Sequence, residues 1–401
     1  MHAVRAPVAF DGSRFLPGGA TVLVDGERIA GVEAFGYDVP DGCTVASYDG
    51  TVLPGLINTH SHLSSEGSLG ALERVGMATD DEIDATIVQS LRSQLGGGVT
   101  TVRDLGDRHF RTVVARERMA PGLPRVLAAG PPITTDGGHC HYLGGEVSGI
   151  DGIRAAIAER RDRGVDVVKV MASGGMLTLG TDIFGVQFTA EELRSLVDQA
   201  HEAGLAVLAH AHSLAGIEHA FAAGVDGIEH FTGLAEGGLR VPDELLERVA
   251  AAGVTVDPTL GFDRAAFEAL PAPPAGVLEA MRRTGLDPLT FNSARIEVAR
   301  RMREHGVRVI TGVDDGAIAT KRHGSIALAI GDLVSAGYPM AEALATATSV
   351  AAEACGLAEV TGSLRAGLAA DVLVVDGDLR EGPEPLMSPA AVLVRGVSAV
   401  P

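Results

Sequence analysis

Short apolar runs separated by turn residues occupy both ends of the chain. Residues 21–35, TVLVDGERIAGVEAF, and residues 43–55, CTVASYDGTVLPG, read as short strands, and their DGE and DG turns are typical of β-hairpins. The last part of the chain shows the same pattern in GSLRAGLAADVLVVDGD and AVLVRGVSAV. We therefore predict one small composite β-sandwich domain, built from residues 1–53 and 360–401 around a different middle.

The middle of the chain, residues 54–359, alternates strand-like apolar runs with helical stretches. TAEELRSLVDQAHEAG predicts a helix in which Thr189 is the N-cap, Glu192 completes a capping box and Gly204 follows the C-terminus. SARIEVARRMREHG predicts another helix, ended by Gly306. Eight apolar runs predict strands, at 55–63, 99–106, 124–132, 165–173, 206–213, 226–233, 254–260 and 308–316.

This alternation predicts the fold class. Strands that alternate with helices pair in parallel and are joined by right-handed crossovers. Eight such units fit a (β/α)8 TIM barrel, so we predict an α/β protein with one barrel and the small β-sandwich domain. Active-site residues of such barrels lie at the C-terminal ends of the strands. Polar side chains that end the eight predicted strands should therefore meet at one mouth.

Composition and charge narrow the possible partners. The 401 residues are 46% hydrophobic and 21% charged, as in a globular protein large enough for one barrel domain. With 32 Lys and Arg against 52 Asp and Glu, the net charge is −20. Nucleic acid and anionic membranes require a basic face, so we expect neither as a partner. A small-molecule substrate remains; a homo-oligomer is compatible with the fold but has no direct signal.

The cysteines and the N-terminal residues indicate in which cellular compartment the protein is expected. Cys43, Cys140 and Cys355 lie far apart and form no CxxC motif, so a disulfide framework is not expected and a reducing compartment fits. The first residues lack a basic stretch followed by an apolar core, and no apolar run approaches the roughly 20 residues that span a bilayer. We expect a cytoplasmic protein.

Metal-ligating residue types end several of the predicted strands. His60 and His62 end the first, and their i, i+2 spacing places both imidazoles on one face, as two ligands of one metal require. The later strands add Lys169, His210, His212, His230 and Asp314. Nitrogen and carboxylate donors of this kind suit zinc or a similar divalent ion.

Each of these residues has an ordinary explanation when it is taken alone. A lone HxH is common, and a single buried histidine is more often a core residue than a ligand. Lys169, inside VDVVKVMASGG, would normally pair with a carboxylate or lie on an edge strand, because burying an ammonium is costly. Independent accidents would not place all of them at strand ends in barrel order, so the joint pattern favours a metal site.

Several segments resemble the amidohydrolase superfamily of metal-dependent hydrolases. PGLINTHSHL is similar to its first-strand signature, and VVKVMASGG to the fourth-strand segment whose lysine is carboxylated by CO2 in binuclear members. LAHAHS, GIEHFTG and ITGVDDG resemble the fifth, sixth and eighth strand segments, and GSLRAGLAADVLVVDGD the segment that re-enters the β-sandwich. The resemblance covers nearly the whole chain and is strongest to the imidazolonepropionase-like group, which includes Xaa-Pro dipeptidases.

The resemblance implies a role for each matching residue. His60 and His62 match ligands of the more buried metal, and Lys169, as a carbamate, matches the bridge between two divalent ions, which we expect to be zinc. His210 and His230 match ligands of the second ion. Asp314 matches the residue that contacts the first metal and a bridging hydroxide; there it can take the proton during attack and pass it to the leaving amine.

Three further residues are candidates for substrate binding. The resemblance implies His210 as the fifth-strand ligand and His212, two residues on, as a residue that faces substrate, although the choice between His210 and His212 as ligand stays open. TTDGGHCHYLGGE resembles a family segment whose histidine contacts the substrate, and His139 matches it best. Tyr142 is a weaker candidate of the same loop.

Other charged residues near the predicted strand ends have structural interpretations. Adjacent side chains of a strand cannot both face the metals, so we expect Asp315, which follows Asp314, to be a loop residue. Arg103 and Asp104 end the second strand and are expected to form a structural ion pair near the mouth of the barrel. Arg282 and Arg283, in a Pro-rich segment that could form a helical lid, are candidate carboxylate ligands, although solvated helix charges are the simpler interpretation.

These features together predict a binuclear metal-dependent amidohydrolase that cleaves an amide or peptide bond of a dipeptide or an N-acyl amino acid. A lactonase, esterase or phosphotriesterase could use the same metal centre. A deaminase would place a glutamate three residues after the fifth-strand histidine, where this chain has Ser213 or Ala215. A non-catalytic scaffold would have lost ligands, and all of the expected ligands are present. The sequence does not name the substrate side chain.

Overall fold

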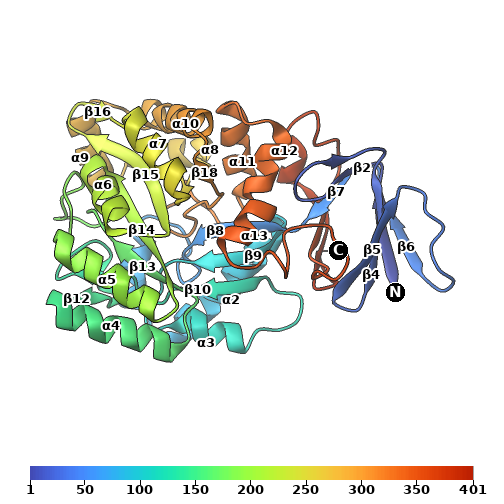
Figure 1. Cartoon of the computed structure of the whole chain (residues 1–401), viewed down its shortest axis with the longest axis horizontal. Coiled ribbons are helices and arrows are strands. Elements are labelled where there is room, and N and C mark those ends of the chain that lie inside the picture. The colour runs from blue at the N-terminus through green and yellow to red at the C-terminus, as the bar shows by residue number, and fades with distance from the viewer. Residues whose placement is uncertain (401) are drawn as a thin grey trace.

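The computed structural model describes residues 1–400, and the chain forms a β-rich part and a larger α/β part (Figure 1). Both chain ends lie in the β-rich part. One of its sheets has the order β5 (Arg28–Ala34), β4 (Ala20–Asp25), β1 (His2–Ala6) and β6 (Thr44–Ser47). The other has the order β21 (Val397–Val400), β20 (Pro389–Val394), β19 (Val372–Val375), β7 (Thr51–Pro54), β2 (Val8–Phe10) and β3 (Phe15–Leu16).

The pairing of β7 with β19 joins the two ends of the chain. Leu53 lies opposite Leu373 in this antiparallel pair. Val22 of the first sheet and Val52 and Val372 of the second belong to one buried apolar cluster, so the two sheets share a core. The β-rich part therefore depends on segments more than 300 residues apart in the sequence.

Every predicted strand of the middle segment contains a strand in the structure, and these eight strands pair in parallel. The first sheet comprises β8 (Leu56–Ser61), β9 (Val99–Asp104) and β10 (Arg125–Ala128). The second comprises β13 (Val167–Met171), β14 (Ala206–Ser213), β15 (Gly227–Ala235), β17 (Thr255–Asp257) and β18 (Arg308–Val309), with β16 (Gly238–Leu239) antiparallel to β15.

Isolated parallel bridges connect these two sheets on both sides. Ser61 bridges to Asp315, beyond β18, and Ile133, beyond β10, bridges to Val170 of β13. Most of these strands are shorter than predicted, and β18 ends at Val309 where the prediction extended to 316. β10 and β17 end before prolines, at 131–132 and at 258, which have no N–H for the ladder.

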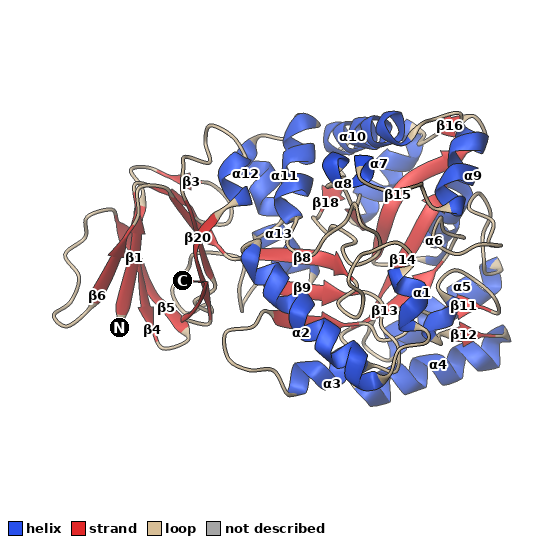
Figure 2. Cartoon of the chain, turned by 180° about the vertical axis from the view of Figure 1, so that it is seen from behind, coloured by secondary structure: helices blue, strands red, loops and turns tan. Residues whose placement is uncertain are grey.

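Helices cover the outer sides of the parallel strands (Figure 2). Thr189 caps α5 (Ala190–Glu202) with Glu192 as the capping-box partner, as predicted, and Gly204 follows with a φ of 74°. The helices that follow strands in this way are α2 (Asp80–Gly96), α3 (Arg111–Glu117), α4 (Gly149–Arg163), α5 (Ala190–Glu202), α6 (Leu214–Ala223), α7 (Asp243–Ala252), α10 (Pro288–Glu304), α11 (Ile326–Ser335), α12 (Met340–Thr346) and α13 (Ser349–Ala354).

Further elements lie in the loops of the α/β part: α1 (Ala71–Val75), β11 (Thr134–Thr135), the 3-10 helix η1 (His141–Leu143), β12 (Glu146–Val147), α8 (Arg264–Glu268) and α9 (Ala275–Thr284). The 3-10 helix η2 (Glu384–Met387) lies between β19 and β20. The Pro-rich segment thus contributes α9, as the lid hypothesis anticipated. No helix of the described residues has the length and apolar character needed to span a bilayer.

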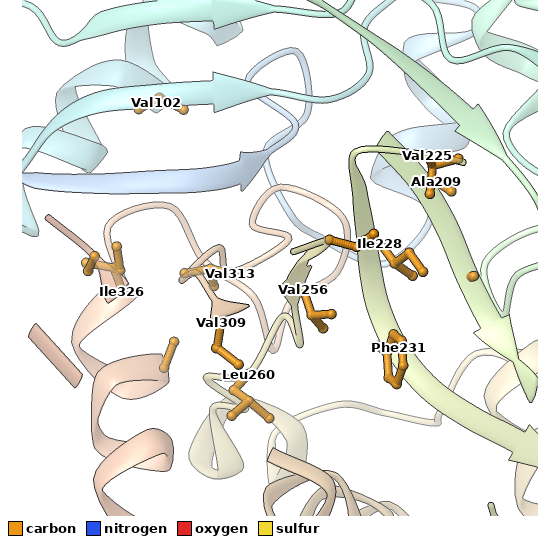
Figure 3. Packing of buried hydrophobic residues seen from close by; sticks show 14 of the residues in the cluster. Val102, Ala209, Val225, Ile228, Phe231, Val256, Leu260, Val309, Val313 and Ile326 are labelled. Atoms are coloured by element: carbon orange, nitrogen blue, oxygen red, sulfur yellow. The ribbon is translucent and has the colours of Figure 1, made fainter. Parts of the chain in front are cut away.

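Apolar packing between strands and helices decides which side chains face inward. Ile228, Val256 and Val309, from neighbouring strands, belong to one buried cluster with Leu260 and Ile326 (Figure 3).

On β14, Val207, Ala209 and Ala211 belong to this same cluster. Side chains alternate along a strand, so this packing places His210 and His212 on the opposite, inner face. The apolar pattern that builds the core thus also directs the histidines inward.

Candidate metal centre

The chemically active side chains gather at the carboxyl ends of the parallel strands. His60 lies on β8 and His62 directly follows it, while Asp314 follows β18. They line one cavity together with Lys169, His139, His210, His212 and His230. The structure therefore brings together all of the predicted metal ligands, which lie up to 254 positions apart in the sequence.

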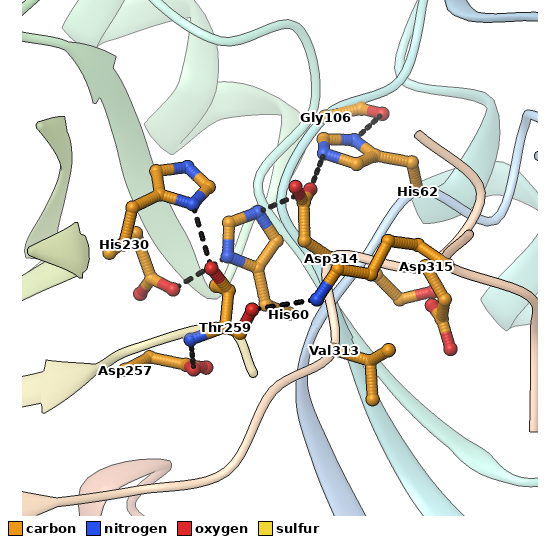
Figure 4. Close-up of polar contacts among 12 residues, drawn as sticks. His60, His62, Gly106, His230, Asp257, Thr259, Val313, Asp314 and Asp315 are labelled. Carbon is orange, nitrogen blue, oxygen red and sulfur yellow. Dashed lines mark hydrogen bonds and ion pairs between the residues drawn. The ribbon is translucent and has the colours of Figure 1, made fainter. Parts of the chain in front are cut away.

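His60, His62 and Asp314 form the first ligand set. Their donor atoms lie within 4.8 Å of one another, and Oδ1 of Asp314 is 3.3 Å from His60 Nε2 and 3.1 Å from His62 Nε2 (Figure 4). Burial opposes ionisation of Asp314, but the two imidazoles outweigh it and hold the pKa of this carboxyl well below its usual range. Two imidazoles and one carboxylate in this arrangement suit a divalent ion.

His210, His212 and His230 form the second set, with donor atoms within 4.8 Å of one another. Nδ1 of His212 is 2.8 Å from Thr232 Oγ1, and Nδ1 of His230 is 3.0 Å from Thr259 Oγ1. Burial lowers the pKa of all three imidazoles, so they are neutral, the form that binds metal. Both histidines of β14 belong to the set, so the geometry does not choose between them.

Lys169 lies in the middle of β13 and is 1% exposed. Its Nζ has no hydrogen-bond partner among the described residues, which is costly for an ammonium. Burial lowers the pKa of Lys169, which favours the neutral amine. Its charge also lowers the pKa of His60 and of His210, so it lies within electrostatic reach of both ligand sets.

Glu229 is a site residue that sequence reasoning missed. Its Oε2 is 2.7 Å from His60 Nδ1, and its Oε1 is 3.3 Å from Arg103 Nη2. A carboxylate behind a ligating histidine fixes the ring and its tautomer. The expected ion pair of Arg103 with Asp104 is wrong: Asp104 instead accepts hydrogen bonds from backbone N–H groups, and Arg103 pairs with Glu229.

Asp315 lies in the loop after β18, as predicted, and belongs to neither ligand set, but its side chain is fully buried. It accepts hydrogen bonds from Asn58 Nδ2 at 2.8 Å and Gln94 Nε2 at 2.7 Å, and it faces His323 Nδ1 at 3.3 Å. Asp314 has a φ of 64°, and the turn there lets the adjacent side chains point in different directions (Figure 4). Asp315 thus anchors the loop that carries Asp314.

The two candidates of the loop after β10 differ. His139 is buried and lines the cavity, and its ring centroid is 4.6 Å from that of His210. Its Nδ1 is 2.8 Å from Thr178 Oγ1. Tyr142 does not line this cavity; its hydroxyl faces Cys140 Sγ at 3.7 Å, and its side chain borders neighbouring hollows instead. The structure brings His139 to the predicted ligands and leaves Tyr142 outside.

The outer wall of the cavity is mostly apolar. It comes from the segment that contains α8, α9 and the start of α10, with Phe262, Phe267, Leu270, Val277, Met281 and Phe291. Arg282 and Arg283 of α9 lie outside it and pair with Glu279 and with Glu236, respectively. Two other cations, Arg295 and Lys321, line the cavity and were not singled out from the sequence.

Comparisons with known proteins give one family. The model of the Amidohydrolase family matches residues 51–398. An uncharacterized protein of Mycobacterium tuberculosis is 28% identical over 93% of this chain and 90% of its own. The ochratoxinase of Aspergillus niger is 26% identical over 85% of this chain and 73% of its own.

Among solved structures, a Xaa-Pro dipeptidase with methionine bound in its active site has a TM-score of 0.82 and 25% identity, covering 99% of both chains. A prolidase complexed with N-methylphosphonate-L-proline has a TM-score of 0.82 and 25% identity, covering 99% of this chain and 98% of its own.

Proposed function

This chain belongs to the amidohydrolase family, and we propose that it hydrolyses an amide or peptide bond of a dipeptide or an N-acyl amino acid at a two-metal centre. A hydrolase that acts on carbon–nitrogen bonds agrees with the family and with its peptidase-like and amide-hydrolysing relatives. The observation that carries the two-metal proposal is Lys169, which is buried within reach of both ligand sets and whose Nζ has no hydrogen-bond partner among residues 1–400.

The fold supports this proposal. The eight parallel strands and the bridges at 61–315 and 133–170 are what a closed (β/α)8 barrel requires, and we assign residues 54–359 to it. We assign residues 1–53 and 360–401 to a composite β-sandwich domain, on the strength of the shared core and the pairing of β7 with β19. The candidate ligands would then lie at the mouth of the barrel.

The residues fit two divalent ions, which we propose to be zinc. His60, His62 and Asp314 would hold one, and His210 and His230 the other, with His212 as the alternative ligand from β14. Lys169 would join them as a carbamate, because a neutral buried amine reacts with CO2 and the product is an anion with two oxygens. When bound, such ions polarise a carbonyl and make hydroxide available near neutral pH.

Protein side chains would transfer the proton, contact the substrate and orient a ligand. Asp314 is held in its ionised form, so it can take the proton of the attacking water and give it to the leaving amine. His139 lies beside His210, and burial lowers its pKa to about 3, so it would meet the substrate as a neutral hydrogen-bonding group. Glu229 keeps the His60 ring oriented.

A substrate panel tests this function. Zinc-loaded protein is incubated with dipeptides, N-acyl amino acids, lactones and an aryl phosphotriester, and the products are quantified. We expect amide cleavage with kcat/KM well above that for the other classes. Turnover of lactones or phosphotriesters alone would replace the amide proposal by the lactonase or phosphotriesterase alternative.

A further inference from the structure

Two cations in the wall of the cavity form no ion pair with a carboxylate of the described residues. Lys321, in the loop between β18 and α11, is 6% exposed, and Arg295 lies on α10. Both line the cavity that holds the candidate ligands. Among residues 1–400, neither forms an ion pair within 4.0 Å, whereas most other arginines of the chain do.

All of their hydrogen bonds go to the turn at residues 258–260. Lys321 Nζ donates to the carbonyl oxygens of Thr259 at 2.7 Å and of Leu260 at 2.6 Å. Arg295 Nη2 donates to the same Thr259 oxygen at 2.6 Å, to Thr259 Oγ1 at 2.9 Å and to the Pro258 oxygen. Arg295 Nε is buried and has no hydrogen-bond partner in the part of the chain that the structure describes.

Two cations that share one carbonyl oxygen repel each other. Burial and the neighbouring Arg295 lower the pKa of Lys321 to about 7. Asp314, Asp332 and Asp257 act on the pKa of both cations in the opposite direction, but none of them forms an ion pair with either cation within 4.0 Å. The direct partners are carbonyl and hydroxyl oxygens, which carry only partial charge. An anion that enters the cavity beside them would add a counter-charge at ion-pair distance, which neither cation has among the described residues.

The position of the pair fits an anion that is part of the substrate. Arg295 lowers the pKa of His212, and Lys321 lowers that of Asp314, so both cations lie within electrostatic reach of the candidate centre. The carboxylate of an amino acid is separated from its acylated nitrogen by one carbon, which places it near the bond to be cleaved.

The other residues that line the cavity indicate the nature of the acyl group on the other side of the amide bond. Of the described residues that line the cavity, Asp314 is the one carboxylate, so a free ammonium group would find no other anionic partner. Phe267, Val277 and Met281 instead present an apolar wall. We propose that the substrate is an N-acyl amino acid with an apolar acyl group, whose carboxylate is bound by Arg295 and Lys321; this inference rests on the proposed function.

A binding experiment tests the carboxylate subsite without bond cleavage. The probes are N-benzenesulfonyl-phenylalanine, whose sulfonamide replaces the amide, and the carboxamide of the same compound. Calorimetry on the zinc-loaded protein should give a Kd about 10- to 100-fold lower for the carboxylate. In Arg295→Gln and in Lys321→Met this ratio should fall at least about tenfold.

Matched variants separate recognition from a structural role. Arg295→Lys, which retains the charge, should keep most of the ratio, and Arg282→Gln, which removes an exposed charge on α9, should leave it unchanged. If Arg295→Gln and Lys321→Met weaken both probes equally, the two residues only support the turn at 258–260 and the inference is wrong. Because no bond is broken, failure of amide hydrolysis would not by itself produce that result.

A second experiment tests whether the substrate has an apolar acyl group. Zinc-loaded protein is given N-hexanoyl-phenylalanine and the dipeptide Ala-Phe, which share the leaving amino acid. We expect kcat/KM to be at least about tenfold higher for the acyl compound, because its chain is buried and no ammonium is desolvated. Equal or faster cleavage of the dipeptide would overturn this half while leaving the amidohydrolase activity in place.

Discussion

At the candidate metal centre, some side chains depart from the alternating directions of an ideal strand. Glu229 and His230 are adjacent, yet Glu229 contacts His60 and His230 belongs to the second ligand set. His230 has a φ of 69°, so the regular pleat ends there. The sequence pattern predicts His60, His62 and Asp314 because strand ends suffice to place them. It could not predict Glu229, because alternation places that side chain on the opposite face from its neighbour.

Replacing the buried lysine tests its role at the residue scale. Lys169→Ala removes the side chain proposed to form the carbamate bridge, so we expect loss of bound zinc and a fall in kcat of at least about 1,000-fold. Added formate or acetate should restore part of the activity by supplying the missing oxygens. Metal analysis and kinetics check both points, and full activity in the variant would exclude a bridging role for Lys169.

The acid behind His60 gives a second prediction at this scale. Glu229→Gln keeps a hydrogen-bonding group but removes the charge that holds the His60 ring, so we expect zinc affinity to fall about 10- to 100-fold. Competition with a chromophoric chelator measures this. The exposed Glu191→Gln, on α5, is the control and should bind zinc as the unaltered chain does. Equal affinity in both variants would contradict a supporting role for Glu229.

At the scale of elements, periodicity predicts the strands well and the loops poorly. The eight strands occur where apolar runs predict them, because burial on both faces of a parallel sheet demands such runs. The cavity wall between β17 and β18 depends instead on how α8, α9 and α10 fold over the strand ends. No local pattern reveals that Arg295 and Lys321 meet at the turn of residues 258–260, since that contact is made only in the folded chain.

Helix α9 offers a matched pair of substitutions. Met281 lines the cavity, whereas Leu278 of the same helix is 48% exposed and lies outside it. Met281→Ala should lower kcat/KM for N-hexanoyl-phenylalanine about tenfold, through lost apolar contact, and affect N-acetyl-phenylalanine less. Leu278→Ala should change neither value. Steady-state kinetics with both substrates checks this, and equal effects of the two variants would mean that α9 does not contact the acyl chain.

At the scale of the whole molecule, strands from the two ends of the chain form the β-rich part together. β19 lies between β7 and β20, and Val372, Val374 and Leu393 are buried in the core shared with the N-terminal strands. A chain ended after Asp371 would expose β7 and lose that core, so we expect it to be insoluble or to lack a cooperative thermal transition. A folded, cooperative truncated chain would show that the α/β part is independent of the C-terminal strands.

Global charge and local charge lead to different conclusions about partners. A net charge of −20 argues against nucleic acid, yet the cavity contains two cations without carboxylate partners among the described residues. The sequence therefore predicts the fold class and the candidate ligands, whose spacing follows from the strands. It does not predict the substrate, because the groups proposed to recognise it come from separate loops and helices.

A zinc titration of the metal-free chain tests the two-metal amidohydrolase most directly. Hydrolysis of N-hexanoyl-phenylalanine is followed while zinc is added in known ratio to protein, with CO2 present throughout. We predict that activity rises to a plateau at two zinc ions per chain. A plateau at one zinc ion per chain, or no amide hydrolysis at any ratio of zinc to protein, would contradict the proposed two-metal amidohydrolase.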